Sequence, residues 1–120
     1  MKRLMLRLAP LALLALLVGS GCVVYEHDAD AHVTFFWDCN GYDCHSVGVD
    51  EVLVQIWDGR RLEAEQYVPG SASGVTVEDF FSGDYDYEIR GLDWQGRLLY
   101  FGSGSIYLHS GDNHYDVRLY

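Results

Sequence analysis

The residues best placed to do chemistry in this 120-residue chain are two histidines near its C-terminus. His109 and His114 flank a short turn in which Gly111 stands at the first central position of a two-residue type II′ hairpin loop. In that register the two side chains face each other, with Cβ atoms about 4.5–5.5 Å apart. Asp112 or Asp116 could add an oxygen ligand, so the pattern predicts a site for zinc, copper or nickel. The alternative is a pair of solvent-exposed surface histidines.

Two acidic segments also contain groups that bind cations. Residues 26–32 read EHDADAH, but no rigid scaffold surrounds them, so we interpret residues 22–32 as a solvated acidic tether. Asp84, Asp86 and Glu88 alternate with tyrosines and could hold calcium. The spacing of a calcium-binding EF-hand loop is absent, and three acids at every second position are typical of the solvent-facing side of a strand.

The three cysteines divide into a pair and a single residue. Cys39 and Cys44 are separated by NGYD, whose Asn and Gly favour a tight turn, and we expect a disulfide between them in an oxidising compartment. Zinc is the weaker interpretation, because these two thiols and His45 supply at most three ligands. Cys22 remains for another role.

These groups must be positioned by strands, because apolar and polar residues alternate after residue 32 and no helical period is visible. All 17 aromatic residues lie beyond residue 21. Seven strands in about 90 residues suit an antiparallel β-sandwich. The strands are expected at about 33–38, 50–57, 62–68, 75–80, 84–92, 97–109 and 113–120.

The hairpin of strands 84–92 and 97–109 has the clearest turn, with Asp93 and Gly96 at the first and last positions of a type I turn. The register that follows pairs Ile89 with Phe101 and turns one face to the core, namely that of Tyr85, Tyr87, Ile89, Leu99 and Phe101. The GSGS segment at 102–105 permits a bulge or a bend into the other sheet. The register of the hairpin around Asp58 and Gly59 stays open between a two-residue and a three-residue loop.

The segment from Phe81 to Tyr120 resembles the closing half of immunoglobulin-like or prealbumin-like domains of bacterial envelope proteins. Those domains often show a Gly-x-Tyr entry, an alternating strand, a D-x-x-G turn and a last strand after a Gly turn. The matching residues here are Gly83, Tyr85, Asp93, Gly96 and Gly111. The resemblance implies a sandwich used for display, binding or spacing, since a fold carries no chemistry of its own.

The N-terminus has the layout of a signal peptide, with three basic residues before an apolar run from Leu8 to Val18 that is too short to span a bilayer. Residues 18–22, VGSGC, resemble the lipobox of bacterial lipoproteins, although Gly19 stands where that family usually has Leu. The resemblance implies cleavage after residue 21 and lipidation of Cys22. Val23 follows instead of Asp, which by the same resemblance favours the outer membrane. Cleavage without lipid, giving a soluble secreted or periplasmic protein, is the alternative.

We therefore expect a signal peptide at 1–21, a tether at 22–32 and a sandwich domain at 33–120. The chain carries a net charge of −10, and residues 22–120 hold 5 arginines against 18 acids, a net charge of −13. Such a charge argues against nucleic acid as a partner, and it leaves the lipid as the means of membrane attachment.

No catalytic or cofactor motif stands out, so we expect a non-enzymatic envelope binding or structural module, with a protein or glycan as its possible ligand. The alternatives are a metal-binding lipoprotein that uses the histidine pair and a carbohydrate-binding module with exposed aromatic side chains. The aromatic side chains expected on outer faces are Phe36, Tyr100, Tyr107 and Tyr120, and aromatic rings there could bind ligands or be covered by the second sheet.

Overall fold

Seven strands and one turn of 3-10 helix make up the part of the chain that the computed structural model describes, residues 29–120. Each predicted strand is present, and its ends lie within two residues of the predicted ends. The tether predicted for residues 22–32 ends earlier than expected, because the first strand begins at Ala31. The elements are β2 (Ala31–Cys39), η4 (Cys44–Val47), β3 (Glu51–Asp58), β4 (Arg61–Pro69), β5 (Gly74–Phe80), β6 (Gly83–Leu92), β7 (Leu98–Leu108) and β8 (Gly111–Leu119).

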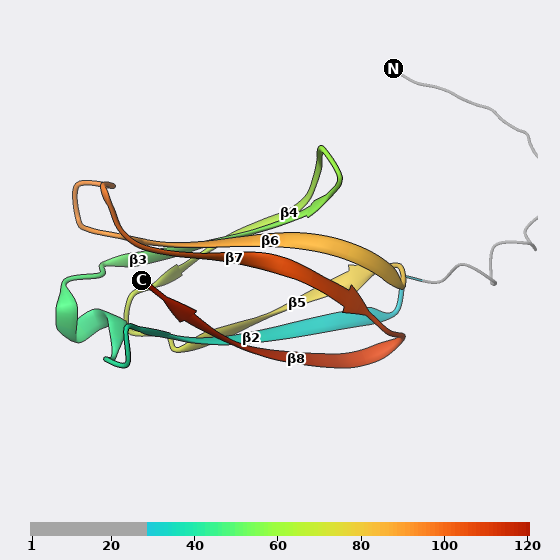
Figure 1. The fold of residues 1–120 in the computed structure, drawn as a ribbon, viewed down its shortest axis with the longest axis horizontal. Coiled ribbons are helices and arrows are strands. Elements are labelled where there is room, and N and C mark those ends of the chain that lie inside the picture. The colour runs from blue at the N-terminus through green and yellow to red at the C-terminus, as the bar shows by residue number, and fades with distance from the viewer. Residues whose placement is uncertain (1–28) are drawn as a thin grey trace, which may run out of the picture.

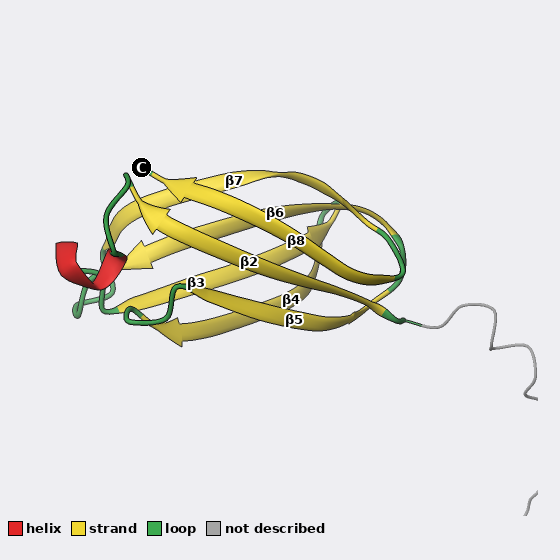
Figure 2. Ribbon diagram, turned by 90° about the horizontal axis from the view of Figure 1, so that it is seen from below, coloured by secondary structure: helices red, strands yellow, loops and turns green. Residues whose placement is uncertain are grey.

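The strands form two facing sheets, one with the order β5-β2-β8 and one with the order β4-β3-β6-β7 (Figures 1 and 2). The all-β sandwich is thus confirmed. The prediction that every pairing is antiparallel was wrong, because the first strand, β2, pairs in parallel with the last strand, β8. Among residues 29–120, no helix has the length and apolar character needed to cross a membrane.

The strand order differs from that of an immunoglobulin constant domain. That fold places its first, second, fourth and fifth strands in one sheet. Counted within residues 29–120, the first strand (β2) lies between the fourth (β5) and the seventh (β8), and the second, third, fifth and sixth strands (β3, β4, β6 and β7) form the other sheet.

The hairpin predicted between β7 and β8 does not form, because the chain crosses from one sheet to the other at this point. Asn113, which is buried at the start of β8, stabilises this crossing between the sheets. Its Nδ2 donates to the carbonyl oxygens of His109 (2.8 Å), His32 (2.9 Å) and Gly111 (3.2 Å), and its Oδ1 accepts the backbone N–H of His109 (2.9 Å). These hydrogen bonds satisfy the backbone groups of the turn and attach the turn to β2. Strand β8 therefore pairs in parallel with β2 and not with β7.

The turn between β6 and β7 is the predicted one. The Gly96 N–H donates to the Asp93 carbonyl oxygen (2.9 Å), and Gly96 has φ = 82°. A register shift between Gly91 and Leu92 then adds Leu99 as an extra residue on β7, so Tyr100 faces Gly91. The predicted pairing of Ile89 with Phe101 was therefore wrong.

The extra residue reverses which side chains of β7 face the core. Tyr85 and Ile89 are buried as predicted, and Tyr87 packs against the core, whereas Leu99 is 42% exposed and Phe101 turns outward. Tyr100, expected on the outside, packs against the core instead. The loop at Gly59 has two residues. Beyond a bulge near Ile56, the side chains of Val52, Val54 and Ile56 face the core, and Ala64 and Val68 of β4 lie on the same face.

The GSGS segment contains neither the bulge nor the switch of sheets that it permits, because β7 pairs with β6 throughout this segment without a register shift. Its glycines leave space for large inward side chains, one from the facing sheet and one from the neighbouring strand β6. A Cβ atom at Gly102 would lie 2.7 Å from Leu119 Cδ2, and one at Gly104 would lie 2.9 Å from the Tyr87 hydroxyl. Tyr87 itself packs against Phe35 of the facing sheet, with ring centroids 5.0 Å apart.

The predicted disulfide between Cys39 and Cys44 is confirmed, and both half-cystines are buried in the core. The loop between them turns through Asn40 and Gly41, both with positive φ. Asp38 holds this loop, since its carboxylate accepts the Gly41 N–H (2.8 Å) and the Arg118 Nε–H (2.9 Å). The bridge therefore contributes to the core and also fixes the loop.

The bonds of Asn113 predict a large loss of stability on its removal. We expect Asn113→Ala to lower the free energy of unfolding by more than about 2 kcal/mol, because it opens a gap at a buried position and leaves partly buried carbonyl groups without donors. Asn113→Asp keeps the shape and removes the donors, so it should cost at least as much. Urea unfolding of both variants measures this, with the exposed neighbour Asp112→Ala as the control. A change below 0.5 kcal/mol, about that of an ordinary surface substitution, would contradict the role of Asn113.

The Asp93 turn predicts a pH dependence of stability. The backbone N–H groups of Arg97 and Gln95 and the Arg97 guanidinium lower the pKa of the Asp93 carboxyl. A carboxyl with a lowered pKa stabilises the fold above its ordinary pKa, and the contribution is lost as the pH falls through the folded value. Asp93→Asn should thus be less stable than the parent at pH 7, and the gap should narrow below about pH 4. Thermal unfolding at both pH values measures the gap, which in an Asp112→Asn control should stay near zero.

Candidate functional site

The two histidines of the predicted metal site do not form a cross-strand pair. His109 lies in the connection after β7, and His114 lies on β8, which pairs with β2. The His109 ring packs on Tyr107, and the His114 ring packs on Phe36, each at 4.8 Å between centroids. Tyr107 and Phe36 point outward from different sheets, so the rings lie on opposite faces of the sandwich.

The possible oxygen ligands do not restore this site. Asp116 lies 3.5 Å from His114 Nε2, and Asp112 is exposed at the start of β8. Within residues 29–120, no group of three or more His, Cys, Asp and Glu side chains has the arrangement needed to hold a metal ion. The register that suggested the site was therefore wrong, and the geometry gives a metal at these residues no support.

The predicted lipidation site, Cys22, and the signal peptide at residues 1–21 lie outside the described residues. So do Glu26, His27 and Asp28 of the acidic segment. Of that segment's last residues, Asp30 accepts a hydrogen bond from the Ser110 hydroxyl at 2.6 Å, and His32 belongs to β2.

The aromatic side chains expected on the outside do not form one platform. Phe36, Tyr107 and Tyr120 are 41%, 47% and 72% exposed, as predicted. Phe36 and Tyr107 point away from each other, because they belong to the outer faces of different sheets. These residues therefore give no shared aromatic surface.

A groove of about 600 Å³ lies on the outer face of the four-stranded sheet. We define the groove by its outward side chains, which are Trp57, Arg60, Asp86, Glu88, Ser103 and Ser105. Adjacent strands place them in rows. In one row Trp57 of β3 lies beside Asp86 of β6, which lies beside Ser105 of β7; in the next, Glu88 lies beside Ser103.

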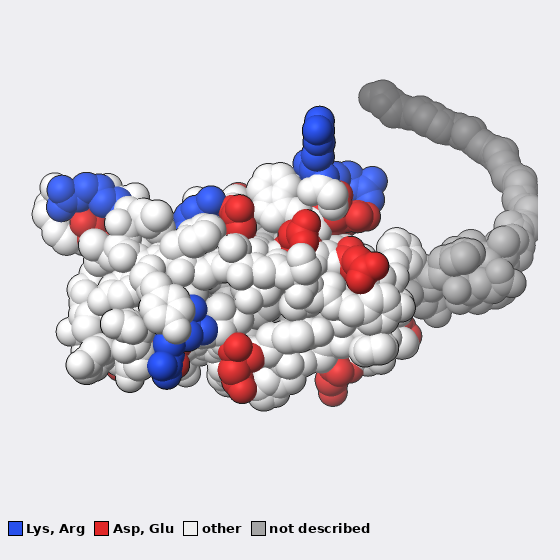
Figure 3. Space-filling view, viewed as in Figure 1, with Lys and Arg blue, Asp and Glu red and all other residues white. Residues whose placement is uncertain are grey.

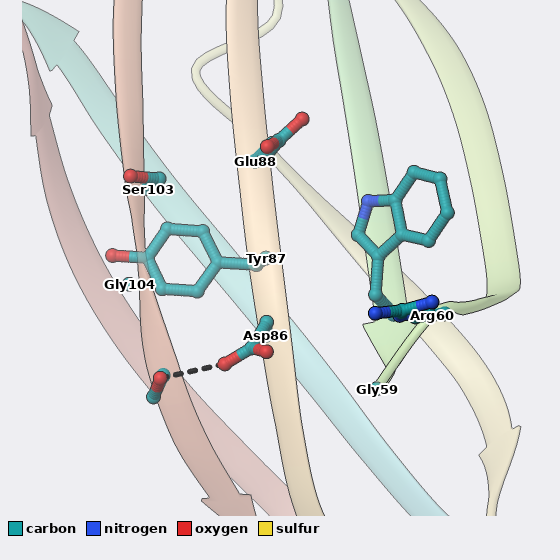
Figure 4. A pocket seen from close by; sticks show the side chains of 9 residues that line it. Gly59, Arg60, Asp86, Tyr87, Glu88, Ser103 and Gly104 are labelled. Carbon is teal, nitrogen blue, oxygen red and sulfur yellow. Dashed lines mark hydrogen bonds between the residues drawn. The ribbon is translucent and has the colours of Figure 1, made fainter.

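The floor of the groove is formed where Tyr87 and Gly104 turn toward the interior. Figure 4 shows the Tyr87 ring reaching across to Gly104, between the strands that carry Asp86, Glu88 and Ser103. Burial raises the pKa of the Tyr87 hydroxyl. The small serines on the outer side of β7 leave the space above this floor open.

Hydrogen bonds fix the polar side chains of the groove. The Ser105 hydroxyl donates to Asp86 Oδ1 at 2.6 Å. Arg90 donates to Glu88 Oε1 and to Gln55 Oε1, both at 2.7 Å, and the guanidinium lies 5.5 Å from the centre of the Phe101 ring. Gln55 in turn donates to Glu65 on β4 at 2.6 Å. This network joins three strands, β4, β3 and β6, and orients Glu88 before any ligand arrives.

The groove is close to neutral, although the chain is strongly acidic. Arg90 pairs with Glu88 (2.7 Å), and Arg60, at the turn beside the groove, pairs with no acidic side chain among residues 29–120. Arg60 in the groove and Arg90 beside it therefore stand against Asp86 and Glu88. Figure 3 shows the same mixture on a larger scale, since basic and acidic side chains alternate along the margin formed by the four-stranded sheet.

The sequence predicts some of the residues of the groove but not how they lie together. The alternation in β6 placed Asp86 and Glu88 together on a solvent-facing side, as the structure does. The alternation does not show that Trp57 and the serines lie beside these carboxylates, because that depends on the registers of β3 and β7. The register of β3 was left open by the sequence, and the register of β7 is shifted by a bulge.

Comparison of the chain with family models, with curated proteins and with solved structures gives no match.

The positions of His109 and His114 predict how the protein responds to zinc. Because the two rings lie on opposite faces, they cannot share an ion within one molecule. We expect His109→Ala to leave the heat of zinc binding in a calorimetric titration unchanged from that of the parent. His114→Ala is the matched variant. A low-micromolar site lost in both variants would show that the histidines converge after all.

Proposed function

We propose that the protein is a lipid-anchored, non-enzymatic binding module of a bacterial envelope, and that the groove is its binding site. The observation that carries the proposal is the hydrogen-bonded network in and beside the groove. Because Arg90 holds Glu88 and Ser105 holds Asp86, binding requires little ordering of these side chains. Such preorganisation lowers the entropic cost of association.

Recognition suits this groove better than catalysis does. A carboxyl that acts as a general acid near neutral pH is usually desolvated in an apolar pocket. Here Asp86 is exposed, and the side chain of Glu88 is 35% exposed and paired with Arg90. Carboxylates in such surroundings serve as hydrogen-bond acceptors for a ligand.

The fold of this module is, in our proposal, the prealbumin-like one of the two that the C-terminal segment resembles. The immunoglobulin order requires the first and second strands in the same sheet. The observed separation of β2 from β3 into different sheets supports the other alternative.

The N-terminal pattern supports attachment through lipid on Cys22, with the outer membrane as the favoured location. A membrane protein with a net charge of −13 beyond residue 21 gains nothing from anionic headgroups, whereas two or more acyl chains hold it stably. The strand β2 begins nine residues after Cys22, so the sandwich would lie close to the membrane.

Intact mass of the protein purified from its membrane tests the anchor. We expect the mass of residues 22–120 with acyl groups on Cys22 and with one disulfide. Reduction should add two hydrogens, because the bridge joins Cys39 to Cys44. A mass equal to the unmodified chain from Met1 would contradict the anchor.

Occupancy of the groove in the envelope is tested by thiol labelling. The matched variants are Ser103→Cys, in the groove, and Asp116→Cys, whose parent side chain is 84% exposed on the other sheet. We expect a maleimide to label Ser103→Cys several-fold more slowly in intact envelopes than in purified protein, while Asp116→Cys changes little. Equal ratios for the two variants would contradict binding at the groove.

A further inference from the structure

The chemistry of the groove narrows the class of ligand, and this inference rests on the proposed function. The groove offers three kinds of group side by side. Trp57 supplies an aromatic surface, Asp86 and Glu88 supply acceptors, and Arg60 and Ser103 supply donors. A ligand that uses all of them must have an apolar surface bordered by hydroxyl groups.

The free oxygens of the carboxylates set the hydrogen bonds that such a ligand must make. Each carboxylate uses one oxygen within the protein, Asp86 Oδ1 with Ser105 and Glu88 Oε1 with Arg90. The second oxygens, Asp86 Oδ2 and Glu88 Oε2, accept no hydrogen bond from residues 29–120. An acceptor without a donor binds a ligand O–H or N–H group, and a carboxylate does so more strongly than a neutral acceptor.

The mixture of basic and acidic side chains in and beside the groove opposes the binding of strongly charged ligands. A polyanion would meet Asp86 and Glu88, with Asp84 further along the same side of β6. A polycation would meet Arg60, and it would have to compete with Arg90 for Glu88. Since like charges brought together oppose binding, a neutral ligand fits both sets of groups.

A sugar ring meets these conditions. Its C–H face packs on an aromatic ring, and its hydroxyl groups donate to carboxylates and accept from a guanidinium. The cavity of about 600 Å³ lies within the range of small-ligand sites and is open to solvent.

We propose that the groove binds a neutral saccharide, with its ring packed on Trp57 and its hydroxyl groups hydrogen-bonded to Asp86, Glu88 and Arg60. Ser103 forms the opposite wall, where any larger side chain would occupy the space of the sugar.

The test is calorimetric titration of the full-length protein in detergent with three neutral probes, namely maltotriose, cellotriose and tri-N-acetylchitotriose. We expect at least one to bind. Ser103→Arg should abolish this binding while leaving the unfolding midpoint unchanged, because Ser103 is exposed and packs on nothing in the core. Trp57→Ala should weaken it at least tenfold. The matched control is Asp116→Arg, on the other sheet, which should bind as the parent does.

Several outcomes would overturn the proposal. One is no binding of any neutral probe at millimolar concentration, and another is equal loss of binding in Ser103→Arg and in Asp116→Arg. Tighter binding of spermidine or of a trimer of galacturonic acid would overturn the neutral class in particular. If the sugars fail while Ser103→Cys is still shielded in envelopes, the groove has another ligand and the binding function stands. If shielding also fails, both proposals fall.

Discussion

The structure depends on which of two alternating sets of side chains faces the interior of the sandwich. Side chains in a strand alternate with a period of two, so a single extra residue exchanges the inner and outer sets. Two bulges make this exchange here. One adds Leu99 to β7, and the other lies opposite Ile56 in the β3–β4 hairpin. Beyond each bulge the apolar set faces the other sheet, and the polar set, with Ser103 and Ser105, faces water.

The same alternation explains why the groove lies where it does. Along the GSGS segment the inner positions are Gly102 and Gly104, against which Leu119 and Tyr87 pack. The outer positions are serines, which are too small to fill the space beside the longer side chains of β3 and β6. One short segment therefore leaves space for large inward side chains and opens the outer face, and replacing either set with larger residues would remove one of these effects.

The strands could be predicted from sequence because each is specified by its own residues, through alternation and through turn signals such as Asp93 and Gly96. The disulfide could be predicted because its two cysteines are close in sequence. The partner of β8 could not. The turn at Gly111 suits a hairpin with β7, but the bonds of Asn113 to His32, 81 residues away, favour pairing with β2. Local turn chemistry carries no information about such a distant partner, so the histidine pair that relied on it failed too.

Only part of the groove could be predicted from the sequence. Asp86 and Glu88 could be placed on one outer face from alternation alone, but a binding site also needs their neighbours on β3 and β7. Which residues become those neighbours depends on the bulges. The packing between the sheets determines whether each bulge stabilises the fold. With Tyr100 turned inward, Phe101 comes to lie beneath the Arg90 guanidinium, and Arg90 reaches both Gln55 and Glu88. Had β7 kept the register set by its turn, Phe101 would face the core and Arg90 would lose this support. The shift that buries Tyr100 is thus also the one that supports the acceptor network of the groove.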